Sequence, residues 1–199
     1  MIMEKQLIIS LGREFGSAGH EIAQMLATHY GLPLYDHNLL RKIAEERAVA
    51  ENGNTTEDEL FPRKVKYVSS SPQDAVVKMQ FDYLKRKAES GESFVVVGRC
   101  SEHVLKAYPG LITIFILGDM DCKVERIKRI YELDEDEAIE LIRLKDRKRK
   151  AYHNSYCEGK WGDSRNYELS INSSKLGLEG TFKILCDYID SRVAPDTEG

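Results

Sequence analysis

The first 31 residues place an apolar run, a glycine-rich turn and an amphipathic helix directly after one another. Residues 6–11 (QLIISL) are almost continuously apolar, which predicts a strand buried on both faces of a parallel sheet. Residues 12–19 (GREFGSAG) supply the turn, and residues 20–30 repeat apolar side chains at helical spacing until Gly31 ends the helix. This order favours an α/β fold in which the turn lies beyond the carboxyl end of the strand, where such folds bind ligands.

Strands and helices alternate along the rest of the chain. Short apolar or β-branched runs predict further strands at residues 33–35, 94–97, 111–117 and 167–171. Helical spacing predicts helices from residue 39 onward, with Asp36 or Asn38 as N-cap, and over residues 74–90, 122–131, 135–152 and 178–189. We therefore predict a three-layer α/β fold, a parallel sheet of about five strands joined by right-handed crossovers, with helices on both faces.

Composition and charge narrow the class of protein. The 199 residues are 42% hydrophobic and 31% charged, which is typical of one globular domain. The net charge of −4 gives no support to a nucleic-acid binder, so a phosphate site requires a local group of Arg and Lys, for which residues 143–150 are the clearest candidate. No apolar run approaches the roughly 18 residues of a membrane span, and the apolar stretch within the first ten residues is too short for a signal peptide. We expect a cytoplasmic protein without nucleic-acid or membrane partners, and its oligomeric state stays open.

The four cysteines, Cys100, Cys122, Cys157 and Cys186, are widely spaced. They form no CxxC pair and have no accompanying histidine run, which argues against a zinc site, and nothing suggests a disulfide framework. No Ser–His–Asp or Cys–His arrangement is readable either, so the sequence assigns no nucleophile.

Residues 12–19 are the segment from which we expect the chemistry to start. Because glycine lacks a Cβ, successive backbone N–H groups can turn inward around a phosphate oxygen, and the following helix adds its positive N-terminal end. Gly16 and Gly19 stand between strand and helix, and Ser17 supplies a small hydroxyl. The alternative is a tight turn whose glycines only allow the helix to pack closely on the strand. The context favours the phosphate site and leaves the alternative open.

The loop departs from the consensus GxxxxGK[ST] of phosphate-binding loops. When Gly19 is aligned with the second glycine, Glu14 replaces the first glycine and His20 replaces the lysine. Glu21 then stands at the hydroxyl that normally binds Mg²⁺. The lysine normally reaches the β- and γ-phosphates, whereas histidine is shorter and mostly neutral at pH 7. Arg13 or another arginine must therefore supply the charge, or phosphoryl transfer is weak.

Several segments together resemble the cytidylate kinase-like family, which is related to the nucleoside monophosphate kinases. They are GREFGSAG, residues 30–44 (YGLPLYDHNLLRKIA), residues 95–105 (VVVGRCSEHVL), and the late segments DRKRKAY, WGD and NYELSIN. The resemblance covers about residues 6–190 and is weakest over residues 50–90. It implies one domain over residues 1–191, with an acceptor-binding insertion at about 36–91, a lid at about 143–166 and a flexible tail at 192–199.

The resemblance assigns the donor nucleotide to the glycine loop. Arg129 matches an arginine of the family's donor side, and with Arg13 and His20 it forms the expected catalytic set. The expected nucleotide- and phosphate-binding residues are Gly12, Glu14, Phe15, Gly16, Ser17, Ala18, Gly19 and Glu21.

The resemblance also assigns an acceptor site. Asp36 and Arg41 match a serine and an arginine near the acceptor phosphate, and Arg99 matches the arginine of a Gly-Arg-Asp segment. The lid's Asp-x-x-Arg falls on Asp146 and Arg149, which resemble residues that hold the acceptor's ribose and phosphate. Arginine suits this task because its planar fork grips phosphate with two hydrogen bonds.

These matches imply a phosphotransferase that moves the γ-phosphoryl of ATP to CMP, dCMP or a related acceptor. A Mg²⁺ ion is implied with ATP, held largely by substrate phosphates, with Ser17, Glu21 and Asp119 as candidate protein ligands. The absent loop lysine supports a second hypothesis, a degenerate module that binds a nucleotide or phosphate without catalysis. A third is a kinase for another small hydroxylated acceptor, because residues 50–90 are distinctive.

Overall fold

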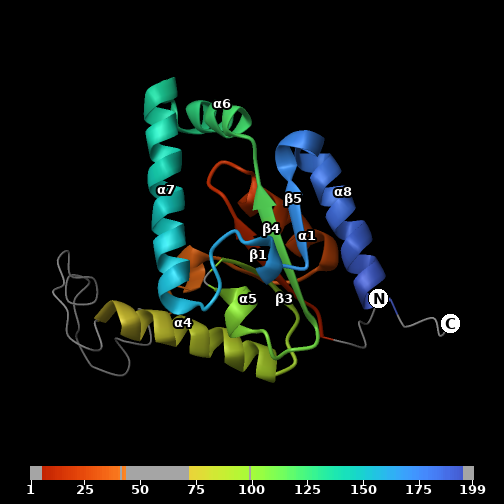
Figure 1. Ribbon diagram of the computed structural model, residues 1–199. Coiled ribbons are helices and arrows are strands. Elements are labelled where there is room, and N and C mark those ends of the chain that lie inside the picture. The colour runs from red at the N-terminus through yellow and green to blue at the C-terminus, as the bar shows by residue number, and fades with distance from the viewer. Residues whose placement is uncertain (1–5, 41, 44–71, 99, 195–199) are drawn as a thin grey trace.

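The computed structural model describes residues 6–40, 42–43, 72–98 and 100–194 (Figure 1). The strands of this part are β1 (Ile8–Arg13), β2 (Leu34–Tyr35), β3 (Phe94–Val97), β4 (Leu111–Leu117) and β5 (Leu169–Asn172). They form one sheet in the order β2-β3-β1-β4-β5, and every neighbouring pair is parallel. The predicted parallel α/β fold is confirmed.

Helices connect the strands. They are α1 (Gly19–Tyr30), α4 (Pro72–Glu89), α5 (Ser101–Val104), α6 (Met120–Tyr131), α7 (Glu135–Tyr156) and α8 (Ser173–Val193), with a 3₁₀ turn at Ser164–Asn166. Residues 37–40 and 42–43 are also helical, and Asp36 caps this segment by accepting a hydrogen bond from the Leu39 N–H at 2.9 Å. Nowhere in the described ranges is a helix both long and apolar enough to cross a membrane.

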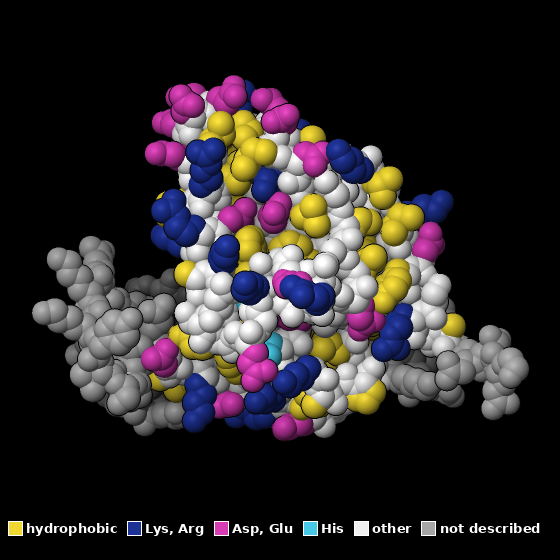
Figure 2. Space-filling view, in the orientation of Figure 1, with side chains coloured by type: hydrophobic (Ala, Val, Ile, Leu, Met, Phe, Trp, Pro, Cys, Tyr) yellow, Lys and Arg dark blue, Asp and Glu magenta, His cyan; other side chains and the backbone are white. Residues whose placement is uncertain are grey.

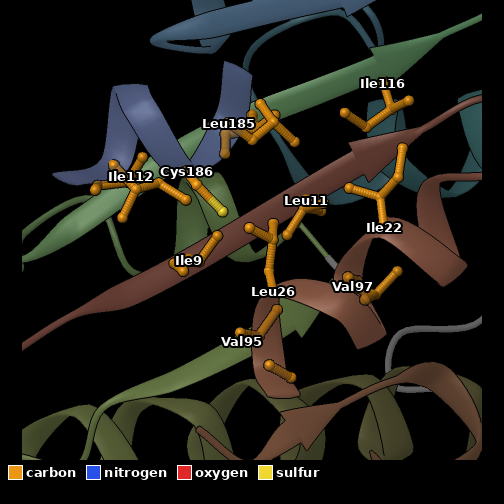
Figure 3. Packing of buried hydrophobic residues seen from close by; sticks show 14 of the residues in the cluster. Ile9, Leu11, Ile22, Leu26, Val95, Val97, Ile112, Ile116, Leu185 and Cys186 are labelled. Atoms are coloured by element: carbon orange, nitrogen blue, oxygen red, sulfur yellow. The ribbon is translucent and has the colours of Figure 1, made fainter. Parts of the chain in front are cut away.

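Strand β1 shows how the core is divided between the two faces of the sheet (Figure 3). Ile9 and Leu11 pack with Ile22 and Leu26 of α1 and with apolar residues of α8. Ile8 points the opposite way and joins a second cluster, to which α4 and the end of α5 contribute. Because both faces of β1 are covered, its sequence is continuously apolar instead of alternating, as in other buried parallel strands.

Several helix boundaries differ from the sequence prediction by a few residues. α7 continues to Tyr156 instead of ending near residue 152, and the rings of Tyr152 and Tyr156 lie 5.0 Å apart on its last turn. α8 has a first turn from Ser173, where Asn172 accepts a hydrogen bond from the Ser174 N–H at 3.0 Å, but Gly177 then interrupts it with non-helical angles (φ 67°, ψ −175°). The part of α8 after this break begins at residue 178, as predicted.

Other predictions have mixed outcomes. Gly31 ends α1 as predicted, with a left-handed φ of 64°. The short helix α5 was not predicted, because four residues carry no periodicity. α8 extends to Val193, so it includes the first two residues of the expected tail. Residues 44–71 of the expected acceptor-binding insertion lie outside the described part, and Pro72 begins α4.

Candidate functional site

The turn between β1 and α1 has a backbone path that only small residues permit. Gly16 has a φ of 86°, and a Cβ built on it would lie 3.1 Å from the Lys123 Cβ. Gly19 has ordinary backbone angles, but its Cβ would come within 2.6 Å of the Arg13 Cβ. Both glycines are therefore required by close packing, and Gly16 is required by its conformation as well.

The same turn presents unused backbone donors. The N–H groups of Gly16, Ser17 and Ala18 donate to no acceptor in the part of the chain that the structure describes. They precede the first turn of α1, whose N-terminal end carries partial positive charge. Free amides at such a position are suited to bind phosphate oxygens.

The Ser17 side chain points into the protein. Its residue is 2% exposed, and its hydroxyl lies within hydrogen-bonding distance of the carbonyl oxygens of Glu14 (2.9 Å) and Ile116 (3.1 Å). The Ser17 carbonyl in turn accepts a hydrogen bond from the Ser173 hydroxyl at 2.8 Å. Ser17 thus fixes the turn against β4 and the start of α8.

A buried lysine connects the turn to α6 and α7. The Lys123 Nζ lies 2.9 Å from the Glu14 Oε2 and 3.7 Å from the Asp146 Oδ2, and the lysine side chain is 7% exposed. The Asp146 Oδ1 accepts a hydrogen bond from the Phe15 N–H at 2.7 Å. Burial raises the pKa of Asp146, while the Phe15 N–H and the Lys123 ammonium act in the opposite direction. Two carboxylates therefore share one ammonium directly beside the loop.

Arg149 of α7 also contacts the turn. Its Nη1 donates to the Arg13 carbonyl at 3.2 Å, and its guanidinium lies 5.5 Å from the centre of the Phe15 ring. Burial lowers the pKa of Arg149, although nearby Asp146 favours its charged form. Helix α7 thus contacts the loop through both Asp146 and Arg149.

A cavity of about 710 Å³, here cavity 1, opens at the carboxyl ends of β1 and β3. Gly12, Arg13, Gly98, Arg149 and Trp161 are among its lining residues. A Cβ on Gly98 would collide with the Arg13 guanidinium, so that side chain reaches across from β1 to the end of β3. α7 lines one wall, and Figure 2 shows how its charge changes, from acidic side chains where α6 and α7 meet to Lys and Arg further along.

A second cavity of about 490 Å³, here cavity 2, lies between the turn, α6 and the start of α8. Gly16, Ser17, Ala18, Arg126 and Arg129 are among its lining residues. Cavity 1 is lined by the beginning of the turn and cavity 2 by its end. The turn therefore separates two cavities that each contain arginine.

A cluster of ionisable side chains lies in the wall of cavity 1. The His153 Nε2 and Glu102 Oε1 are 2.7 Å apart, and each side chain is 6% exposed. Burial disfavours the charged imidazole, but hydrogen bonds with Cys157 and Glu102 raise the pKa of His153 to about 10. A hydrogen bond with Cys100, together with one to His153, lowers the pKa of Cys157 to about 6 against the effect of burial.

Apart from Gly19, described above, the residues predicted for the loop and the catalytic set fall into four groups. Gly12, Arg13 and Phe15 line cavity 1, whereas Gly16, Ser17, Ala18 and Arg129 line cavity 2. Glu14 is held by Lys123, and Glu21 forms an ion pair with Arg126. His20 is exposed at the start of α1 and lines neither cavity.

The positions of the predicted acceptor residues do not test their roles. Asp36 is the helix N-cap described above, and Asp146 and Arg149 contact the loop. Arg41 and Arg99 lie outside the described residues. Whether any of these side chains binds an acceptor stays a prediction.

Sequence reasoning missed Lys123, which stands four residues into α6 with nothing in its local pattern to mark it. It named Trp161 only as part of the WGD segment of the family resemblance. In the structure the Trp161 ring lies 5.5 Å from the Phe115 ring of β4, and Tyr167 lies 5.0 Å from the same ring. A Cβ on Gly12 would come within 2.7 Å of the Phe115 ring. Because Gly12, Trp161 and Tyr167 line cavity 1, their packing on Phe115 sets the shape of this side of the cavity.

Comparisons with known proteins place the chain in a family. The model of the cytidylate kinase-like family matches residues 8–175. The chain belongs to the cytidylate kinase-like family. The predicted resemblance is thereby confirmed over most of the sequence.

Three similar proteins show how far the likeness to this chain extends. The cytidylate kinase of Methanosarcina barkeri is 25% identical over 186 residues, covering 91% of this chain and 95% of that protein. The crystal structure of an uncharacterized protein from Eubacterium ventriosum has a TM-score of 0.78 at 38% identity and covers 94% of this chain and 99% of that one. Shikimate kinase from Bacteroides thetaiotaomicron, with a TM-score of 0.53, 14% identity and coverage of 92% and 98%, shows likeness of fold alone.

The candidate Mg²⁺ ligands do not fit a metal site. The Ser17 hydroxyl points toward carbonyl oxygens inside the protein, and Glu21 is paired with Arg126. Asp119 accepts hydrogen bonds from Asn172 at 2.8 Å and Lys175 at 2.6 Å, which lower its pKa. A Mg²⁺ ion that arrives with ATP would therefore depend on the phosphates and water for its ligands.

Proposed function

We propose that this chain is a phosphotransferase that moves the γ-phosphoryl of ATP to CMP, dCMP or a related nucleoside monophosphate. The observation that carries the proposal is the turn of residues 14–18, which stands between two arginine-lined cavities and whose amides at residues 16–18 have no acceptor in the described part of the chain. Phosphoryl transfer requires a donor and an acceptor in line, with positive charge around the transferred group. A phosphate-binding turn with one cavity on each side provides that arrangement.

In this proposal cavity 2 takes the donor and cavity 1 takes the acceptor. The amides of residues 16–18 bind donor phosphates, and Arg129 at the rim of cavity 2 neutralises their charge. Arg13 and Arg149 face cavity 1 from the other side of the turn, where they hold the acceptor phosphate. The Arg13 side chain, which reaches from the end of β1 to Gly98, is the proposed substitute for the charge of the absent loop lysine. Family membership and the cytidylate kinase relatives support the choice of acceptor class.

The direct test is a coupled assay for ADP release with ATP, Mg²⁺ and each common nucleoside monophosphate. We expect turnover with CMP or dCMP of about 1–100 s⁻¹. Arg129→Ala should lower kcat/KM for ATP by about 100-fold, because it removes one cation from the donor phosphates. Lys183→Ala removes an exposed cation of α8 that lines neither cavity, and it should leave the rate unchanged. The absence of turnover with every monophosphate would exclude the proposed reaction.

One observation favours the second function, a nucleotide-binding module without catalysis. Asp146 already accepts the Phe15 N–H, and Glu14 already neutralises Lys123, so part of the loop's positive potential is used within the protein. This function predicts that ATP raises the melting temperature while no ADP forms with any acceptor. Turnover above the rate of spontaneous ATP hydrolysis would rule it out.

A further inference from the structure

We propose that Glu102, His153 and Cys157 form a zinc-binding site in the wall of cavity 1. Each residue offers one ligand atom, and the three atoms all lie within 4.8 Å of one another. Zinc holds nitrogen, oxygen and sulfur ligands at about 2.0–2.3 Å, so ligand atoms around one tetrahedral ion are roughly 3–4 Å apart. The His153 Nε2 and the Glu102 Oε1 are 2.7 Å apart, and no pair of the three atoms is more than 4.8 Å apart, so the separations bracket this range.

The kinds of ligand select the metal. A thiolate and an imidazole are ligands of zinc and similar transition metals, whereas Mg²⁺ and Ca²⁺ are bound by oxygen. Three protein ligands also leave one tetrahedral position for water or for a ligand group. Glu102 and His153 both line cavity 1, so that position can open toward the cavity. This site is separate from the Mg²⁺ ion that accompanies ATP.

The backbone holds two of the ligands in place. His153 stands on the last turn of α7 and Cys157 is its C-cap, with the Cys157 N–H donating to the His153 carbonyl at 2.9 Å. The carboxyl end of a helix carries partial negative charge, which favours a cation there. Glu102 approaches from α5 and is 94% buried at its side chain, so it is not free to leave the cluster for solvent.

A further residue orients the imidazole. The His153 Nδ1 lies 3.3 Å from the Asn154 Oδ1, which also accepts a hydrogen bond from the Trp161 N–H at 3.0 Å. The Nδ1 of His153 is therefore directed to an acceptor, and its Nε2 is directed to Glu102. Metal-binding histidines are commonly fixed in this way, through the ring nitrogen that does not bind the metal.

The spacing rules for zinc motifs do not reveal this cluster. Glu102 is 51 residues from His153 in the sequence, and the cluster contains only one cysteine ligand. Without metal, the same contacts describe an ion pair between α5 and α7. The two interpretations differ in one measurable property, which is the retention of zinc.

The test uses the full chain without an affinity tag, dialysed against a chelator and then given ZnSO₄. Zinc retained after gel filtration is measured by mass spectrometry, and CoCl₂ is used in parallel because tetrahedral cobalt–thiolate sites absorb visible light. Cys157→Ser and Glu102→Gln each remove one ligand. Cys122→Ser is the control, because Cys122 is an exposed cysteine on α6 outside the cluster.

We expect about one zinc ion per chain in the wild type and in Cys122→Ser. Cys157→Ser and Glu102→Gln should bind zinc at least about 100-fold more weakly. Circular dichroism of the zinc-free variants separates loss of a ligand from loss of the fold, and Glu102→Gln provides a second variant if Cys157→Ser does not fold. A wild-type chain that retains no zinc, or folded variants that retain as much as the wild type, would overturn the site.

Discussion

Lys123→Met should lower the free energy of unfolding by about 3 kcal/mol, because it removes the cation of the partly buried Glu14 and leaves Asp146 with Arg149 alone. The Lys123 Nζ lies 2.9 Å from Glu14 and 3.7 Å from Asp146, whose side chains are 26% and 17% exposed. Methionine fills a similar volume, so the loss of charge is the main change. In a domain of this size the melting temperature should fall by roughly 9 °C, measurable by calorimetry or circular dichroism.

Two further variants isolate the electrostatic contribution. Lys128→Met removes a lysine from the same helix, but its Nζ pairs with Glu125 at the surface, so it should leave the free energy of unfolding nearly unchanged. Adding Glu14→Gln to Lys123→Met removes one orphaned charge and should recover part of the loss. If Lys123→Met destabilises no more than Lys128→Met, the buried pair does not hold the loop.

Gly16→Ala should reduce phosphoryl transfer at least about 100-fold, which is the cost of misplacing reacting groups by about 1 Å. Gly16 has a φ of 86°, which an alanine adopts only with strain. The new Cβ would also lie 3.1 Å from the Lys123 Cβ and 3.3 Å from the Ile127 Cγ1. The backbone must therefore shift at the amides that are proposed to bind phosphate. The measurement is kcat/KM with ATP and CMP.

Gly31→Ala is the matched control for this variant. Gly31 also has a left-handed φ, 64°, but a Cβ there meets nothing within 4 Å and lies at the far end of α1. Both variants should lose stability, by about 1 kcal/mol for Gly31→Ala, yet only Gly16→Ala should lose activity. Equal activity of the two variants would mean that the loop amides do not position the phosphates.

The sequence predicts elements whose cause is local. The strands at Phe94–Val97 and Leu111–Leu117 are found where they were predicted, because β-branched and apolar runs bounded by glycine carry their own signal. The glycine turn between β1 and α1 was predicted for the same reason, since close backbone packing at Gly16 and Gly19 leaves a direct trace in the residue type.

Contacts between distant segments cannot be predicted from local sequence patterns. Lys123 and Glu14 are 109 residues apart, and Asp146 reaches Phe15 across 131 residues. The family resemblance predicted Asp146 as a site residue, but its contact with the loop depends on how α7 packs. Lys123 has no family motif to mark it, so only the folded chain shows that it lies beside the turn.

The most direct test of the two-cavity account is a crystal structure with a bisubstrate analogue, adenosine and cytidine joined through a chain of phosphates. We expect the adenosine in cavity 2 beside Arg129, the cytidine in cavity 1 beside Arg149, and the phosphates over the amides of residues 16–18. Both nucleosides on one side of the turn, or phosphates that make no contact with these amides, would contradict the account.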